Sequence, residues 1–514
     1  MKSSVKNKIK YIAFIVMMNL FSLQLIAQNK MIFPRPFAFA VDDLGWNIGN
    51  DTGDLDNQGP YRIGIDRKMD LNDYKVIVEV GKNVGVRIQS LFVLAEMDRQ
   101  NILKNYPSTT WQGKNWDNSK NIGQEQIDIM DFVKDNAAYM EFGLHGVGHE
   151  FWVDGQKKRA EWYCIEDNHP WNKKTLEQHI QCFKDIMAQY GISKENGQRF
   201  PESFVPCAYG YHWNPDGKFS TGKLMSENGV KYVNTLFETI PELNPPKGNN
   251  GGGFDNGVIV VNRINYGNEW WKQDALPTVP LEKQESDIIE SHWSNWLAQD
   301  NFLQDETTQK FIDYYMMVQK STNRYCAKNT EQFYSQWLYK KYTKVKQKSE
   351  NVVEIDNTKM PNEAYKHDIL GVMVLKVPIM PQEHITYATL NGSQIPAYFE
   401  QSGWAFLYLP VLKQQTYTLK YKIGKQTMPF YVYNDGTYNV YSIKKTNKNM
   451  LIDLKMYGTQ TVKIKCDSSP VNIKSKNKNL KILSYKFDDL NKILSVKIRG
   501  IDIQGERAKI ELSF

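Results

Sequence analysis

The chain has 514 residues, which is long enough for two or three domains rather than one. Hydrophobic residues make up 41% of it and charged residues 24%, a composition typical of a soluble globular protein. The formal net charge of +7 falls once the lysines of an N-terminal signal are set aside, so charge gives no support to a nucleic-acid partner.

The first 27 residues have the pattern of a secretory signal peptide. Lysines at positions 2, 6, 8 and 10 precede an apolar run from Tyr11 to Ile26, and cleavage is expected near Ala27. We therefore expect an exported protein, periplasmic or secreted, with no stable membrane insertion after the signal is removed. The alternative is that this segment stays as an N-terminal membrane anchor; no other stretch is apolar enough to span a bilayer.

Residues 31–346 alternate short apolar runs with longer amphipathic ones, which predicts a β/α domain. Strands are expected over residues 37–41, 86–94, 138–144, 204–206, 231–235, 257–261 and 288–293. Helices are expected over residues 127–136, 175–190, 224–229, 306–319 and 331–346. In parallel α/β architectures the loops that follow the strands gather on one face, and reactive side chains collect there.

Two pairs of potential metal ligands follow strands of this domain. Asp42 and Asp43 come at the end of the first expected strand, and His145 and His149 come directly after the third. Two imidazoles with a carboxylate can bind zinc or a similar divalent ion and leave room for water. From the spacing alone, the alternative is that the two histidines only pack or cap.

The residues between the histidines exclude one familiar zinc site. A peptidase of the HExxH type needs a glutamate directly after the first histidine, and that position is Gly146. Gly146 and Gly148 also disfavour a helix interior, so the histidine pair is placed on a strand-to-helix loop. If the ion activates water, one of the adjacent carboxylates, Asp42 or Asp43, would bind the ion and the other would accept the proton.

The C-terminal third has a different pattern. Residues 347–351 are polar and predict a linker, and beyond them alternating strands are separated by turn dipeptides such as Asn391-Gly392 and Asp435-Gly436. We expect one or two β-sandwich modules there, over residues 352–448 and 449–514.

Cysteine and tryptophan give weaker signals. Five cysteines without CxxC spacing predict neither a zinc knuckle nor a dense disulfide framework, and a bridge between Cys164 and Cys182 is the pairing considered. Most tryptophans are expected in the core, with two or three lining a sugar-binding groove. All tryptophans except Trp404 fall in the first domain, among them Trp46, Trp152, Trp213, Trp270 and Trp271, and the pattern does not indicate which of them line the groove.

Taken together, these motifs resemble those of a known family. The order of Asp42-Asp43, His145-x-x-x-His149, a proline-containing loop at 204–206 and a late His292 is similar to the polysaccharide deacetylase (NodB-homology, carbohydrate esterase family 4-like) superfamily, over about residues 31–300. The resemblance implies a distorted (β/α) barrel of the NodB deacetylase type, followed here by the one or two C-terminal β-sandwich modules. It also implies a hydrolase that removes acetyl groups from N- or O-acetylated polysaccharide or oligosaccharide.

The resemblance also assigns roles to residues. It implies a divalent ion, zinc first with nickel, cobalt or manganese as alternatives, bound by Asp43, His145 and His149. Asp42 matches the general base, and His292 matches the general acid that protonates the leaving group. The loop that lines the substrate groove corresponds to the segment carrying Tyr209, Tyr211, His212 and Trp213.

Two departures from the family pattern leave other functions open. The arginine that pairs with the base is absent from its expected position; Arg199 and Arg263 are the nearest candidates, and neither matches. The acid that orients the late histidine is also not evident, with Glu290 and Glu269 as candidates. A catalytically weakened glycan-binding protein is therefore one alternative, and a glycosidase with paired carboxylates is another. The oligomeric state is left open.

Overall fold

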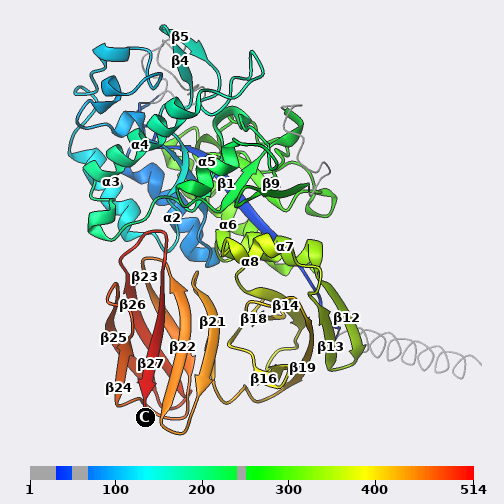
Figure 1. Cartoon of the computed structure of the whole chain (residues 1–514). Coiled ribbons are helices and arrows are strands. Elements are labelled where there is room, and N and C mark those ends of the chain that lie inside the picture. The colour runs from blue at the N-terminus through cyan, green and yellow to red at the C-terminus, as the bar shows by residue number, and fades with distance from the viewer. Residues whose placement is uncertain (1–29, 49–66, 240–250) are drawn as a thin grey trace, which may run out of the picture.

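The computed structural model describes residues 30–48, 67–239 and 251–514 (Figure 1). The expected signal peptide and its cleavage site lie outside the described residues. Among the described residues, no helix is both long and apolar enough to cross a membrane. Figure 1 shows an N-terminal α/β region above, a C-terminal β region below, and helices α7 (Thr330–Tyr342) and α8 (Asn362–Lys366) at the junction between them.

The α/β region is organised around a nine-stranded sheet. Its strands run in the order β10-β1-β2-β3-β6-β7-β9-β8, and β11 also pairs with β1. All neighbours are parallel except β8 and β9, and the strands are buried apolar runs, as expected for a sheet covered on both faces. The bounds are β1 (Arg35–Leu44), β2 (Gln89–Val93), β3 (Gly143–Gly146), β6 (Ser203–Phe204), β7 (Tyr232–Thr235), β8 (Gly252–Asp255), β9 (Val258–Asn262), β10 (Ile288–His292) and β11 (Arg324–Cys326).

The expected distorted (β/α) barrel is wrong, because this sheet is a curled half-barrel that does not close. Its path ends at β10 on one side and β8 on the other, and among the described residues a single bridge, Ile264 to Ile289, links the segment after β9 to β10. The physical reason lies at the edge of β9. The antiparallel strand β8 occupies the hydrogen-bonding edge of β9 that a closing parallel strand would need.

Helices pack against the sheet at most of the positions that periodicity indicates. The bounds are α2 (Leu71–Val84), α3 (Gln124–Asp135), α4 (Lys173–Gln189), α5 (Thr221–Glu227), α6 (Gln304–Lys320) and α7 (Thr330–Tyr342). Helix α2 was not expected from the sequence. It begins at Asp70, whose side chain accepts a hydrogen bond from the Asn72 amide, and ends at Gly85, whose φ of 66° favours glycine.

The C-terminal region contains three sheets instead of one or two separate sandwiches. The five-stranded sheet contains β12 (Lys344–Ser349), β13 (Val352–Asp356), β19 (Thr416–Gly424), β15 (His384–Leu390) and β16 (Ser393–Gln394). The seven-stranded sheet contains β14 (Met373–Pro378), β18 (Trp404–Leu409), β17 (Ala397–Gln401), β20 (Tyr431–Tyr433), β23 (Thr459–Lys465), β26 (Ile493–Gly500) and β25 (Leu480–Asp488). The four-stranded sheet contains β21 (Asn439–Lys445), β22 (Asn449–Met456), β27 (Glu506–Ser513) and β24 (Asn472–Ser475). Because β20 pairs with β23, the largest sheet runs continuously across residue 448.

A buried ionic network joins the two regions. Lys455 on β22 lies 2.7 Å from Glu202 and 3.1 Å from Glu331, with all three side chains less than 10% exposed. Glu202 directly precedes β6, and Glu331 belongs to α7. The C-terminal sheets therefore help to hold the strand that leads into the candidate site. None of the five cysteines forms a disulfide, so the bridge considered between Cys164 and Cys182 is not made.

Candidate metal centre

A cavity of about 350 Å³ lies at the carboxyl ends of β1, β3 and β10. Asp42 on β1 is directly opposite His292 on β10 in the parallel register, and β3 carries His145. The sheet thus brings together residues that are far apart in the sequence, such as Asp42 and His292. The cavity is lined by Asp42, Asp43, Trp46, His145, His149, Arg159, Ala208, Tyr209, Arg263, Trp270 and His292.

The closest pair of potential ligands is His145 and Asp43. Nδ1 of His145 lies 2.7 Å from the carbonyl oxygen of Val205, and because a carbonyl can only accept, Nδ1 carries the proton. In the neutral ring, Nε2 is then an acceptor, and it lies 3.2 Å from Oδ1 of Asp43. That oxygen is buried and has no hydrogen-bond partner among the described residues.

Two acceptors facing each other at this distance fit a shared cation. Ligands about 2.0–2.1 Å from a tetrahedral zinc ion lie about 3.3 Å from each other, close to the separation of these two atoms. A buried carboxylate oxygen without a donor is otherwise unfavourable. The residues present therefore fit a divalent ion at this position.

The Asp43 carboxylate is charged at neutral pH. Burial alone would raise its pKa, but the rings of His145, His292 and His149, when protonated, lower the pKa to about 2. Asp43 also has a φ of 73°, in the left-handed region that aspartate tolerates better than most residues. This bend at the end of β1 lets Asp42 and Asp43 both line the cavity.

His149 is held by its neighbours in the orientation of a ligand. Its Nδ1 lies 3.2 Å from Oε1 of Glu150, and its ring centroid lies 5.1 Å from that of Trp46. Metal-binding histidines commonly donate their second ring N–H to a carboxylate, which leaves the other nitrogen for the ion. Burial lowers the pKa of His149, but the Glu150 carboxylate outweighs burial, and the pKa is raised above its ordinary value.

Glu161 fixes the loop that carries His149 through hydrogen bonds to its backbone. This fully buried carboxylate accepts hydrogen bonds from the backbone amides of Val147, Gly148 and His149. Its other oxygen lies 2.9 Å from Nδ1 of His179, which is also fully buried. His149 has a φ of 68°, and the three amide bonds hold the backbone in this uncommon conformation.

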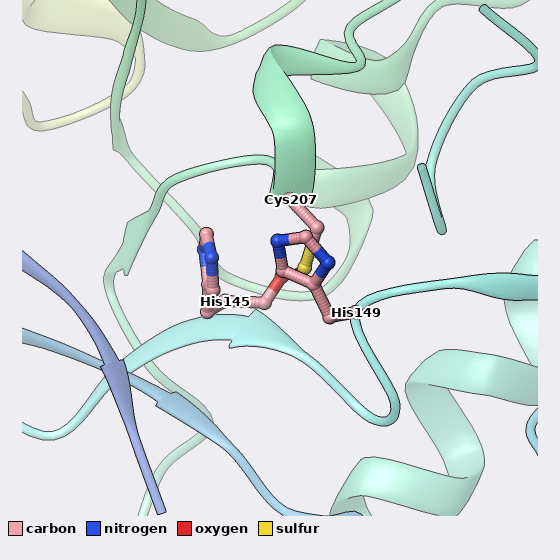
Figure 2. Close-up of side chains that lie close together, drawn as sticks. All are labelled: His145, His149 and Cys207. Carbon is pink, nitrogen blue, oxygen red and sulfur yellow. The ribbon is translucent and has the colours of Figure 1, made fainter. Parts of the chain in front are cut away.

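Cys207 is a neighbour that the sequence did not indicate. Figure 2 shows its side chain approaching His145 and His149, and the potential ligand atoms of the three residues lie within 4.8 Å of one another. However, the thiol donates a hydrogen bond to the His145 carbonyl oxygen at 3.3 Å, burial raises its pKa, and Cys207 does not line the cavity. We therefore place Cys207 behind the two rings. Cys207 has no CxxC spacing, so no sequence pattern places it beside the two histidines.

Arg263 pairs with Asp42, the residue predicted as the base. Its Nη1 and Nη2 lie 2.9 and 2.6 Å from the two oxygens of Asp42, and its Nε lies 3.5 Å from Glu290. Tyr209 donates a hydrogen bond of 2.6 Å to the other oxygen of Glu290. Arg199, the other candidate, pairs with Glu202 and Asp502 outside the cavity. A bidentate pair of this kind fixes the orientation of the carboxylate.

His292 faces the same cavity. Its Nε2 lies 4.0 Å from Oδ2 of Asp42, and its buried Nδ1 has no hydrogen-bond partner among the described residues. Within these residues, neither Glu290 nor Glu269 therefore orients the ring through Nδ1.

The residues predicted to bind substrate separate into two groups. Tyr209 lines the cavity, whereas Tyr211 is buried with its hydroxyl on Asp255, and His212 stacks between Tyr163 and Phe219. Trp213 packs against the core. The substrate-binding roles of Tyr211, His212 and Trp213 stay predictions. Of the tryptophans considered, Trp46 and Trp270 line the cavity.

Comparisons with known proteins add little. No protein-family model matches the chain, and no curated protein matches it. Among solved structures, the chain is similar to a GH57-type branching enzyme from the hyperthermophilic archaeon Pyrococcus horikoshii, at 11% identity and a TM-score of 0.25. That match covers 45% of this chain and 47% of the enzyme, so the chain spans less than half of its length. A likeness at this level carries no inference about fold or activity.

Proposed function

We propose that the protein is an exported, metal-dependent hydrolase that removes acetyl groups from N- or O-acetylated polysaccharide or oligosaccharide. The observation that carries the proposal is the buried Oδ1 of Asp43, which has no donor among the described residues and faces Nε2 of His145 at 3.2 Å. A base and an acid of the expected types, Asp42 and His292, line the same cavity. The motif order described above supports the same reaction class.

Asp43, His145 and His149 would hold the ion. When bound, it would polarise the acyl carbonyl and lower the pKa of water, which is the chemistry of metal-assisted hydrolysis. Zinc suits a mixed set of imidazoles and a carboxylate, although nickel, cobalt and manganese compete for such sites.

The remaining residues move protons and hold the site in place. The Asp42 carboxylate, oriented by the guanidinium of Arg263, accepts the proton of the attacking water. His292, on the adjacent strand, donates a proton to the departing nitrogen or oxygen. Trp46 and Trp270 give the cavity apolar walls against which a sugar ring can pack.

The glycan-binding alternative rested on the absent arginine. Since Arg263 supplies a bidentate partner for Asp42, that reason for expecting lost turnover no longer applies. A glycosidase would need two carboxylates across a cleft. The carboxylates that line this cavity, Asp42 and Asp43, are adjacent in the chain, and one of them is bound to Arg263.

Acetate release tests the proposal. The wild type and Asp42→Asn are incubated with a panel of acetylated polysaccharides and oligosaccharides, with and without a chelator. We expect acetate from the wild type, a loss of about 10²–10⁴-fold in Asp42→Asn, and loss on chelation that added zinc reverses. A zinc-loaded wild type that releases no acetate from any member of the panel would contradict the proposal.

A further inference from the structure

Arg159 lines the cavity, and its charge has no partner among the described residues. It follows the hairpin of β4 (Phe151–Val153) and β5 (Gln156–Lys158), and its side chain is exposed. Two arginines line the cavity. Arg263 is neutralised by Asp42 and Glu290, whereas the guanidinium of Arg159 makes no hydrogen bond or ion pair with any residue in the described part of the chain.

The backbone around Arg159 is fixed relative to the candidate metal ligands. The Arg159 amide donates a hydrogen bond of 2.8 Å to Glu166, and the Ala160 carbonyl accepts one of 3.1 Å from the Trp171 indole. The next amide, that of Glu161, donates to the His149 carbonyl at 2.9 Å. Because only Ala160 separates Arg159 from Glu161, the backbone position of Arg159 is set by the same network that holds the ligand loop.

The carboxylates that line the cavity have balancing charges of their own. Asp42 is paired with Arg263, and the charge of Asp43 would be balanced by the bound ion. The Arg159 guanidinium, which has no partner among the described residues, therefore favours an anion on the substrate. A guanidinium presents its N–H donors in a planar fork that matches the two oxygens of a carboxylate.

We propose that Arg159 recognises the carboxylate of a uronic acid residue in the glycan, next to the acetylated sugar that enters the cavity. This inference rests on the proposed function and narrows its substrate class to acidic acetylated glycans. Arg159 acts in binding and specificity and does not touch the reacting atoms.

Binding without turnover tests the inference separately from acetate release. Two unacetylated oligosaccharides of equal length, one containing glucuronate and one neutral, are titrated into the full chain, and tryptophan fluorescence is followed because Trp46 and Trp270 line the cavity. The variants are Arg159→Gln and, as a control with the same change in charge, Arg499→Gln. Arg499 is 56% exposed and belongs to β26 in the C-terminal region.

We expect the wild type to bind the glucuronate oligosaccharide about tenfold to a hundredfold more tightly than the neutral one, the usual effect of a charge-assisted hydrogen-bonded pair. Arg159→Gln should lose that preference and keep the neutral affinity, and Arg499→Gln should behave as the wild type. No binding of the glucuronate oligosaccharide to the wild type, equal binding of the two oligosaccharides, or an Arg159→Gln variant that keeps the preference would each overturn the inference.

Acetate assays then separate this inference from the proposed function. On an acetylated glucuronate oligosaccharide, Arg159→Gln should raise KM and leave kcat unchanged, since the interaction is made equally before and during the reaction. On the neutral acetylated counterpart both parameters should stay the same. Loss of acetate release from both substrates in the wild type would refute the deacetylase proposal, while the binding preference would still decide the role of Arg159.

Discussion

Arg263 is the residue that joins the acid–base groups of the cavity. Its guanidinium contacts Asp42 and Glu290, all three side chains are almost fully buried, and Tyr209 completes the set through Glu290. Breaking a buried ionic network from one side leaves charges without a partner, which is more costly than removing the network as a whole. The cavity wall at the end of β1 therefore depends on a residue that performs no chemistry.

Substituting Arg263 tests this dependence. Arg263→Met should lower the free energy of unfolding by about 3–5 kcal/mol, because it leaves two buried carboxylates unpaired. The double variant Arg263→Met with Asp42→Asn should be more stable than the single variant, since one of those charges is gone. Denaturant unfolding measures both values. If Arg263→Met lowers the free energy of unfolding by less than about 1 kcal/mol, the Arg263–Asp42 ion pair contributes no more than a solvent-exposed pair would.

His149 should make metal binding depend on pH near neutrality. Burial lowers its pKa, but Glu150 raises it above the ordinary value of 6.5, so the ring keeps its proton to a higher pH than a free histidine. A histidine binds metal only when unprotonated. Zinc affinity should therefore fall as the pH is lowered, with a midpoint above 6.5, whereas Asp43, with a pKa of about 2, stays ionised throughout.

Competition with a chromophoric chelator between about pH 5 and 8 measures this midpoint. In Glu150→Gln the carboxylate that raises the pKa is absent, so the midpoint should move to lower pH. An unchanged midpoint would show that Glu150 does not act on His149.

Among the secondary-structure elements, the two-residue strand β6 is important for the site because it positions the turn that carries Tyr209. It leads from Glu202 to the turn at Cys207–Tyr209, and it pairs with β3 and β7 through few residues. Lys455 of the C-terminal region bonds to Glu202, and Arg199 bridges Glu202 to Asp502 of that region. The position of Tyr209 in the cavity thus depends on packing between the two regions.

Acid titration of stability tests that connection. Burial would raise the pKa of Glu202, but Lys455, Lys231 and Arg199 lower it from 4.5 to about 2. A carboxyl with a lowered folded-state pKa contributes stability above its unfolded pKa and loses it as the pH falls toward the folded value, here about 3 kcal/mol between pH 4.5 and pH 2.

Lys455→Met should remove part of that loss. It should also destabilise the protein by about 3–5 kcal/mol at neutral pH, because buried Glu331 loses its lysine partner and Glu202 keeps only Arg199 and Lys231. Urea unfolding at several pH values measures both effects. The same pH dependence in wild type and variant would place the stabilising charge elsewhere.

For the molecule as a whole, local patterns in the sequence predict individual helices and strands better than they predict whether a sheet closes into a barrel. Periodicity indicates most strands of the nine-stranded sheet and several of its helices, because burial of one face is a local signal. The failure of the sheet to close depends on β8 pairing with the far edge of β9, and the continuity of the seven-stranded sheet depends on β20 pairing with β23. Which strands pair at their edges cannot be predicted from amino-acid composition or from the periodicity of hydrophobic residues.

Some residues of the candidate site can likewise be predicted from the sequence, whereas others cannot. Asp42, Asp43, His145, His149 and His292 follow strand ends and are recognisable from the sequence, and all five line one cavity. Arg263 is 221 residues from Asp42, and Cys207 is 62 residues from His145, so their contacts follow from the three-dimensional arrangement alone. The position of Arg159 beside the cavity, after the hairpin of β4 and β5, also follows only from the three-dimensional arrangement.

Anomalous diffraction at the zinc absorption edge, from crystals grown with zinc, would show whether Asp43 and His145 bind one ion. We predict a peak at a ligand distance of about 2.0–2.2 Å from both Oδ1 of Asp43 and Nε2 of His145, with a nitrogen of His149 completing the set. The peak should be absent in Asp43→Ala. A wild-type crystal with bound zinc elsewhere and no peak between Asp43 and His145 would contradict the account.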